Sequence, residues 1–199
     1  MANIILALRE APWVKAERAS AWARVLASMS TLATLALVGV THGGVVPDPW
    51  GRPLATDFSS FWTAAKLALD GTPGSAWNSV AHAAAEHTNF GLDAGYAQDY
   101  YAFFYPPPFL LICLPLALLP YNAALAVWLT TTGAAYFAVV RSLLPRSWPA
   151  VLVSLAFPAT LINVEHGQNG ALSTALIGAA TLQLDRRPRA AGACLYQPP

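Results

Sequence analysis

The residues best suited to chemistry are one acid and the aromatics that follow it, in the run Asp57-Phe58-Ser59-Ser60-Phe61-Trp62. The run comes just after the first apolar segment of membrane length, so we expect Asp57 at the edge of a bilayer. A carboxylate in that place could serve as a general base in a membrane enzyme. Aspartate is also a preferred helix N-cap, worth roughly 0.5–2 kcal/mol. The residues alone leave both interpretations open.

Composition places the chain in a membrane. Of the 199 residues, 56% are apolar and 11% are charged, against roughly 25% charged in a soluble domain. Only Arg141, Arg146 and Glu165 carry a formal charge in residues 106–184. A net charge of +1 without a Lys/Arg cluster predicts no nucleic-acid partner. Because Cys113 and Cys194 are far apart, neither a disulfide framework nor a metal site is indicated.

The N-terminal half must position Asp57. Residues 1–21 are basic enough to predict a cytoplasmic N-terminal segment, and residues 22–41 are long enough to cross the membrane. Residues 42–105 are acidic and poor in Lys and Arg, which predicts a non-cytoplasmic loop.

Within that loop the sequence predicts an amphipathic helix that begins at Asp57 and lies along the membrane surface. Its apolar face would hold Phe58, Phe61, Trp62, Ala65 and Leu69, and its polar face Ser59, Thr63, Lys66 and Asp70. A second, weaker helix is predicted over Ser75–Thr88.

Residues 106–184 predict further membrane segments, over Phe109–Leu119, Asn122–Val140, Trp148–Val164 and Gly170–Leu184, followed by a polar tail at 185–199. The stretch 106–120 would reach only about 22 Å as a helix, short of a ~30 Å core. If it is re-entrant or packed inside the bundle, the arginines after the later segments fall on the cytoplasmic side, as the positive-inside tendency requires. The turn at 165–169 then lies on the same side as Asp57. We prefer this topology.

Three stretches together resemble glycosyltransferase family 87. They are DFSSFWTAAKLALDG at 57–71, FYPPP at 104–108 with LLP at 118–120, and GQNG at 167–170 with DRRP at 185–188 and Ala-Gly at 191–192.

The family resemblance implies a polytopic, GT-C-type enzyme that uses polyprenyl-phosphate sugars, as α-1,2-mannosyltransferases do. It implies an all-α integral membrane protein with residues 1–199 in one membrane domain, multi-pass in the plasma membrane. Family members are longer, so the chain would correspond to the N-terminal part of such an enzyme. No cofactor is expected beyond the lipid-linked donor. The expected partners are membrane lipids, the polyprenyl-phosphate sugar donor and a lipid-linked or glycan acceptor.

Site residues follow from the same resemblance. Asp57 matches the catalytic carboxylate of the first loop, which would act as a general base in an inverting transfer. Expected substrate contacts are Tyr105, His166, Gln168, Asn169 and Lys66, with no metal.

Each substrate contact has a simpler interpretation. Tyr105 could belong to an aromatic belt, Lys66 could be a snorkelling lysine, and residues 166–169 could form a plain turn. The alternative for the whole chain is a non-catalytic lipid-carrier or transporter fragment, or an inactive truncated glycosyltransferase.

Overall fold

A computed structural model describes residues 17–18, 20–25, 28, 53–91, 100–144 and 148–184. The predicted span 22–41 therefore lies outside the described residues, except for helical residues 22–25 and 28, as do the tail 185–199 and most of segment 1–21. Every regular element in the described ranges from 53 onward is a helix, so the all-α prediction is confirmed for this part of the chain. The elements are α3 Thr56–Leu69, η1 Pro73–Trp77, α4 Ser79–Phe90, α5 Pro107–Cys113, η3 Leu114–Leu118, α6 Tyr121–Leu143, α7 Trp148–Leu155, α8 Pro158–His166 and α9 Gly170–Gln183.

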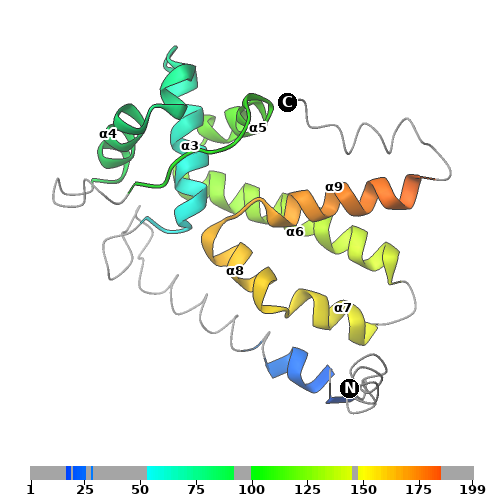
Figure 1. The fold of residues 1–199 in the computed structure, drawn as a ribbon. Coiled ribbons are helices and arrows are strands. Elements are labelled where there is room, and N and C mark those ends of the chain that lie inside the picture. Colours follow the sequence, from blue (N-terminus) through cyan, green and yellow to red (C-terminus); the bar gives the residue numbers. More distant parts are fainter. Residues whose placement is uncertain are drawn as a thin grey trace, which may run out of the picture.

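Helix α3 is the element around which the others pack. It contacts η1, α4, α5, η3, α6 and α8, and Figure 1 shows it standing between α4 and α5 with α6 at its lower end. Helices α6 and α9 run side by side, with α7 and α8 below them (Figure 1).

The aromatic cluster is the core of the molecule near α3. Phe58 and Phe61 are 0% and 1% exposed, and the Phe61 ring meets the rings of Tyr105 and Phe109 edge to face at 5.0 Å. Such pairs contribute about 0.5–1.5 kcal/mol beyond the area they bury. We use the name for the rings that contact one another here: Phe58, Phe61, Trp62, Phe90, Phe103, Tyr105, Phe109, Tyr121 and Trp128.

The prediction of an amphipathic surface helix is wrong for the first half of α3. Two residues of the predicted polar face, Ser59 and Thr63, are completely buried together with the aromatic face. The helix is covered on both sides because α4 and η1 pack on it as well as α5 and η3. Only the C-terminal end of α3 lies at the surface as predicted, since Leu69 is 45% exposed and the C-cap residue Asp70 is exposed.

The stretch predicted to be too short for a span is short and partly buried. Helix α5 passes into η3 at Leu114, where Pro115 cannot supply an N–H for a continued α-helix. Phe109, Leu110, Cys113, Leu116 and Ala117 are buried, and both elements contact α3. This packing agrees with the expectation that residues 106–120 pack inside the bundle, while the topology of the segment stays a prediction.

Helix α6 is the one described helix that is long and apolar enough to cross a membrane by itself, over 23 residues. Helices α7 and α8 meet the same test only as a pair bent by 45°. A membrane-crossing α6 agrees with the predicted Asn122–Val140 segment, while the predicted Trp148–Val164 segment is broken in two.

Proline explains the break between α7 and α8. Pro158 has no N–H, so the carbonyl of Ser154 loses its helical partner. Two hydroxyls replace that partner, since Thr160 Oγ1 donates to Ser154 O at 2.9 Å and Tyr136 Oη at 3.1 Å. Satisfying the freed carbonyl from side chains is the way a broken helix is tolerated in a bundle.

Candidate functional site

An open cavity of about 480 Å³ lies beside the N-terminal half of α3. This volume is within the range found for small-molecule sites. Aromatic walls with a few polar groups are also typical of such sites. Its wall comes from two stretches, α3 and the extended segment 100–105. The lining residues are Asp57, Ser60, Phe61, Tyr100, Tyr101, Ala102, Phe104 and Tyr105.

Asp57 lies in the first turn of α3 and not at its cap. The helix begins at Thr56, its N-cap is Ala55, and no side chain caps it. The N-cap prediction for Asp57 is therefore wrong by two residues. A partly exposed carboxylate in the first turn is favoured by the positive end of the helix dipole.

The backbone just before Asp57 is strained. Ala55 has φ of 57°, the one non-glycine residue with positive φ in the described chain. The left-handed conformation costs an alanine roughly 1–2 kcal/mol. Hydrogen bonds hold it in place, because Ala55 O accepts from Ser59 N at 3.1 Å and from Tyr121 Oη at 3.3 Å.

Tyr105 faces the same cavity as Asp57. Its ring stacks on Phe109 with centroids 4.4 Å apart, which fixes its direction. Burial raises the pKa of the Tyr105 phenol, and the charge of Asp57 raises it further. The phenol is thus held protonated as a donor next to the candidate base.

The turn after α8 meets the N-terminus of α3. His166 Nδ1 lies 2.9 Å from the Oγ1 atom of Thr56, the residue that directly precedes Asp57. Trp128 Nε1 donates to Gly167 O at 2.9 Å. Gly167 has φ of +65°, and a Cβ on it would lie 2.6 Å from Phe58 Cβ, so the turn needs glycine here. The first sequence stretch thus lies against the third at Phe58 and Gly167, and against the second at Phe61 and Tyr105, so all three meet at α3.

The other predicted contacts are less central. Neither His166 nor Gln168 nor Asn169 lines the cavity, and Asn169 is the N-cap of α9. Lys66 lies about 13 Å further along the α3 axis than Asp57, with its ammonium 5.6 Å from the centre of the Trp62 ring. The structure does not bring Lys66 to the cavity.

Sequence reasoning missed a buried acid beside the site. Glu86 is 0% exposed, and its two oxygens accept from Ser59 Oγ at 3.0 Å and Tyr101 N at 2.8 Å. Burial raises its pKa to about 7, opposed by these two hydrogen bonds. His82, one turn earlier on α4, has Nε2 3.9 Å from Glu86 Oε1, and burial lowers its pKa to about 4.

A signal for this pair was present in the spacing. His82, Glu86 and Phe90 recur every four residues and are the buried residues of α4. Val80, by contrast, is 78% exposed. The apolar residue is outside and the acid inside, so a hydrophobicity pattern could not reveal which face of α4 packs on α3. Within the described ranges, no three His, Cys, Asp or Glu side chains gather as metal ligands would.

In its described residues the chain has an all-helical fold with at least one helix of membrane length and an acid on the wall of an aromatic cavity, which defines its class. Residues 103–195 match the profile of glycosyltransferase family 87, so the family predicted from the sequence is confirmed over that stretch. The family is one of membrane-associated glycosyltransferases. No curated protein and no solved structure matches the chain.

The matched stretch covers a little under half of the chain. It contains Tyr105, His166, Gln168 and Asn169, whereas Asp57 and Lys66 precede it. The roles of all six residues remain predictions.

Proposed function

We propose that this protein transfers a sugar, with mannose as the first choice, from a polyprenyl-phosphate donor to an acceptor hydroxyl on the non-cytoplasmic side of the plasma membrane. Asp57 is the general base. The observation that carries the proposal is the position of Asp57 on the wall of the 480 Å³ cavity, beside Tyr105 and one residue from the Thr56–His166 contact.

The chemistry needs one carboxylate. Asp57 takes the proton of the acceptor hydroxyl. At the same time the acceptor oxygen attacks the anomeric carbon from the face opposite the phosphate. The bond from that carbon to the phosphate oxygen breaks, and polyprenyl phosphate leaves with the electron pair. Because phosphate is a good leaving group, no second carboxylate is needed as an acid, unlike in most glycoside hydrolases.

The shape of the cavity suits such a donor. Sugar rings bind against aromatic walls with a few polar groups to orient them, and Phe61, Tyr100, Phe104 and Tyr105 supply aromatic surface next to Asp57. The Tyr105 phenol, kept protonated, can donate to a sugar hydroxyl or to the departing phosphate. The apolar tail of the donor and a lipid-linked or glycan acceptor remain in or at the membrane.

The experiment that tests this proposal compares two aspartates on one helix. Membranes containing the protein are supplied with radiolabelled polyprenyl-phosphate mannose and a lipid acceptor. We expect Asp57→Asn to lower kcat by about 10²–10⁴-fold, the usual contribution of a general base. The matched control is Asp70→Asn, at the exposed far end of α3, for which we expect wild-type kcat.

Wild-type activity in Asp57→Asn would remove Asp57 from the reaction. Equal losses in both variants would point to a general effect of charge on α3 and would also contradict the assignment.

A further inference from the structure

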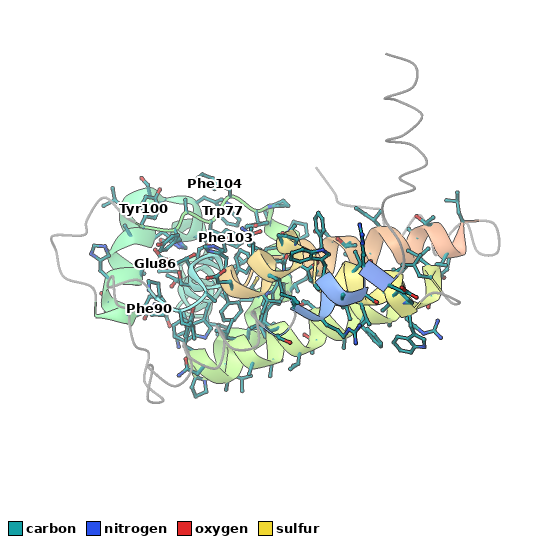
Figure 2. All side chains as sticks on the ribbon, turned by 90° about the horizontal axis from the view of Figure 1, so that it is seen from below. Trp77, Glu86, Phe90, Tyr100, Phe103 and Phe104 are labelled. Carbon is teal, nitrogen blue, oxygen red and sulfur yellow. The ribbon has the colours of Figure 1, made fainter. Side chains whose placement is uncertain are left out.

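Glu86 joins two pieces of the candidate site without entering the cavity. Its Oε1 accepts from Ser59 on α3, and its Oε2 accepts from the backbone of Tyr101 in the segment that forms the other wall. It is absent from the lining residues. Figure 2 shows Glu86 inside the helical cluster, below Tyr100 and Phe103, with Phe104 at the outer edge. A single carboxyl therefore connects both walls.

Ser59 extends the connection to the residue before the candidate base. Its hydroxyl lies 3.0 Å from Glu86 Oε1 and 2.7 Å from the carbonyl of Thr56. Thr56 in turn contacts His166 through its own hydroxyl. A continuous series of contacts thus links the Tyr101 amide, Glu86, Ser59, Thr56 and the turn after α8.

The series can be satisfied in two protonation states. When Glu86 is ionised, Ser59 donates to it and Tyr101 N–H donates to the other oxygen. When Glu86 is protonated, it can donate to Ser59 Oγ, while Ser59 donates to Thr56 O and Tyr101 N–H keeps its acceptor. Buried polar groups are costly only when a partner is missing, so neither state leaves this junction unpaired.

We infer that Glu86 is a positioning residue, which holds the 100–105 segment at a fixed distance from α3 and thereby sets the width of the cavity at Asp57. The inference rests on the proposed function, because the cavity is the one assigned to the sugar donor. Glu86 acts through Tyr101 and Ser59 and touches no substrate.

Other contacts also hold the 100–105 segment, since the Phe61 ring meets Tyr105 and Trp77 Nε1 donates to Tyr105 O at 2.8 Å, but neither of them involves Glu86. His82 from its own helix lies 3.9 Å away and is not hydrogen-bonded to it in the present geometry. The hydroxyl of Tyr121 on α6 donates to the carbonyls of Leu54 and Ala55. Only Ser59 and Tyr101 are hydrogen-bonded to Glu86 among the described contacts.

The first test is hydrogen–deuterium exchange of the purified protein in detergent. We expect Glu86→Ala to raise exchange of the amides of residues 101–105 about tenfold, the effect of one lost hydrogen bond, while the amides of α6 keep their protection. Glu86→Gln should stay close to wild type, because its amide can donate to Ser59 Oγ and its oxygen can accept from Tyr101, as the protonated acid does. Thr88→Ala on the exposed side of α4 is the matched control.

Unchanged exchange at 101–105 in Glu86→Ala would overturn the inference. If Glu86→Ala does not fold, Ser59→Ala takes its place, since it removes the connection to α3 and leaves the Tyr101 bond intact. We then expect faster exchange at 101–105, and wild-type exchange there would again overturn the inference.

The second test is kinetic and separates the inference from the proposed function. With a short-chain polyprenyl-phosphate mannose as donor, Glu86→Ala should raise the donor KM about tenfold with kcat within about threefold, and Glu86→Gln should restore KM. A loss confined to kcat would mean that Glu86 takes part in the reaction and would overturn a positioning role. If the wild type transfers no sugar, the proposed function fails, and the exchange experiment still decides whether Glu86 holds the segment.

Discussion

The aromatic cluster around α3 and a second region, formed by the C-terminal half of α6 with α7, α8 and α9, are built in opposite ways. Around α3, buried rings contact one another, and Phe58, Phe61, Ala64 and Ala65 are at most 1% exposed. In α7, α8 and α9 the buried residues are few and mostly small, while Trp148, Phe157 and Ile177 are more than half exposed. A helix that hides little inside the protein and is apolar outside suits a lipid environment. The first region can therefore fix a site, and the second provides apolar surface.

The largest expected difference concerns one phenylalanine in each region. Phe58→Ala removes a completely buried ring from the aromatic cluster and should lower the free energy of unfolding by about 3–5 kcal/mol. Phe137→Ala on α6, where the ring is 38% exposed, should cost less than about 1 kcal/mol.

The buried Cys113 provides the measurement. In a Cys194→Ser background it is the one remaining thiol, and a thiol-reactive dye reports its exposure during thermal unfolding in detergent. Similar losses for Phe58→Ala and Phe137→Ala would contradict the division into two regions.

Two glycines give the next effect. Gly167→Ala should cost about 2–4 kcal/mol, because alanine is strained at φ +65° and its Cβ would press on Phe58. Gly133→Ala on α6 meets nothing within 4 Å and should stabilise the helix by up to about 1 kcal/mol. The same dye assay measures both. Tolerance of alanine at 167 would mean that the turn does not press on α3.

The pH dependence of stability is also expected to come from groups packed near the aromatic cluster. The pKa of Glu86 is raised to about 7, so the folded state holds a proton that the unfolded state has released above pH 4.5. This contribution to stability is complete below pH 4.5 and is lost as pH rises through 7. For His82, whose pKa is lowered to about 4, stability is lost as pH falls from 6.5 through 4.

Above pH 6.5 the Glu86 effect is the larger of the two, because the unfolded-state histidine is already half deprotonated at that pH. We expect the free energy of unfolding to fall by about 0.5 kcal/mol between pH 6.5 and 8.5, the loss from Glu86 being partly offset by the remaining gain from His82. Glu86→Gln should remove this decrease, whereas Asp70→Asn should keep it. Chemical denaturation at several pH values makes the measurement, and a decrease that persists in Glu86→Gln would assign it to another group.

The smallest effect is expected at the bend of the second region. Thr160→Val deletes one of two hydroxyls that hold the Ser154 carbonyl and should cost about 0.5–1 kcal/mol. Adding Tyr136→Phe removes the other and should cost more than the sum of the two single changes. Thr181→Val, an exposed hydroxyl on α9, is the control. Strictly additive losses would show that the two hydroxyls do not share this carbonyl.

The sequence indicated the helices because apolar length and proline positions are local properties. It placed α6 and α9 within a few residues, and the short segment before Pro120 was identified from its length alone. The packing of α3 was not predictable in this way. Ser59 and Thr63 are polar, and only the presence of α4 on that side, with Glu86 as a partner for Ser59, makes their burial possible.

The site followed the same division. Asp57, Tyr105 and His166 were identified through a family resemblance, and they lie at one end of α3. Glu86 was not identified in this way. A pattern of apolar and polar residues predicts that an acid is exposed and a valine buried, and α4 shows the reverse. The importance of Glu86 appears only when Ser59 and the Tyr101 amide, 27 and 15 residues away in sequence, are placed beside it.

Tyr121 relates the site to the bilayer. It is the first residue of the membrane-length helix α6, and its hydroxyl donates to the carbonyls of Leu54 and Ala55, just before Asp57. If α6 crosses the membrane from Tyr121 onward, these bonds place Asp57 at the level of the lipid headgroups. Under the proposed function, the phosphate of the donor lies at that same depth, so the carboxylate and the lipid-borne sugar would meet by diffusion in two dimensions, without the donor leaving the membrane.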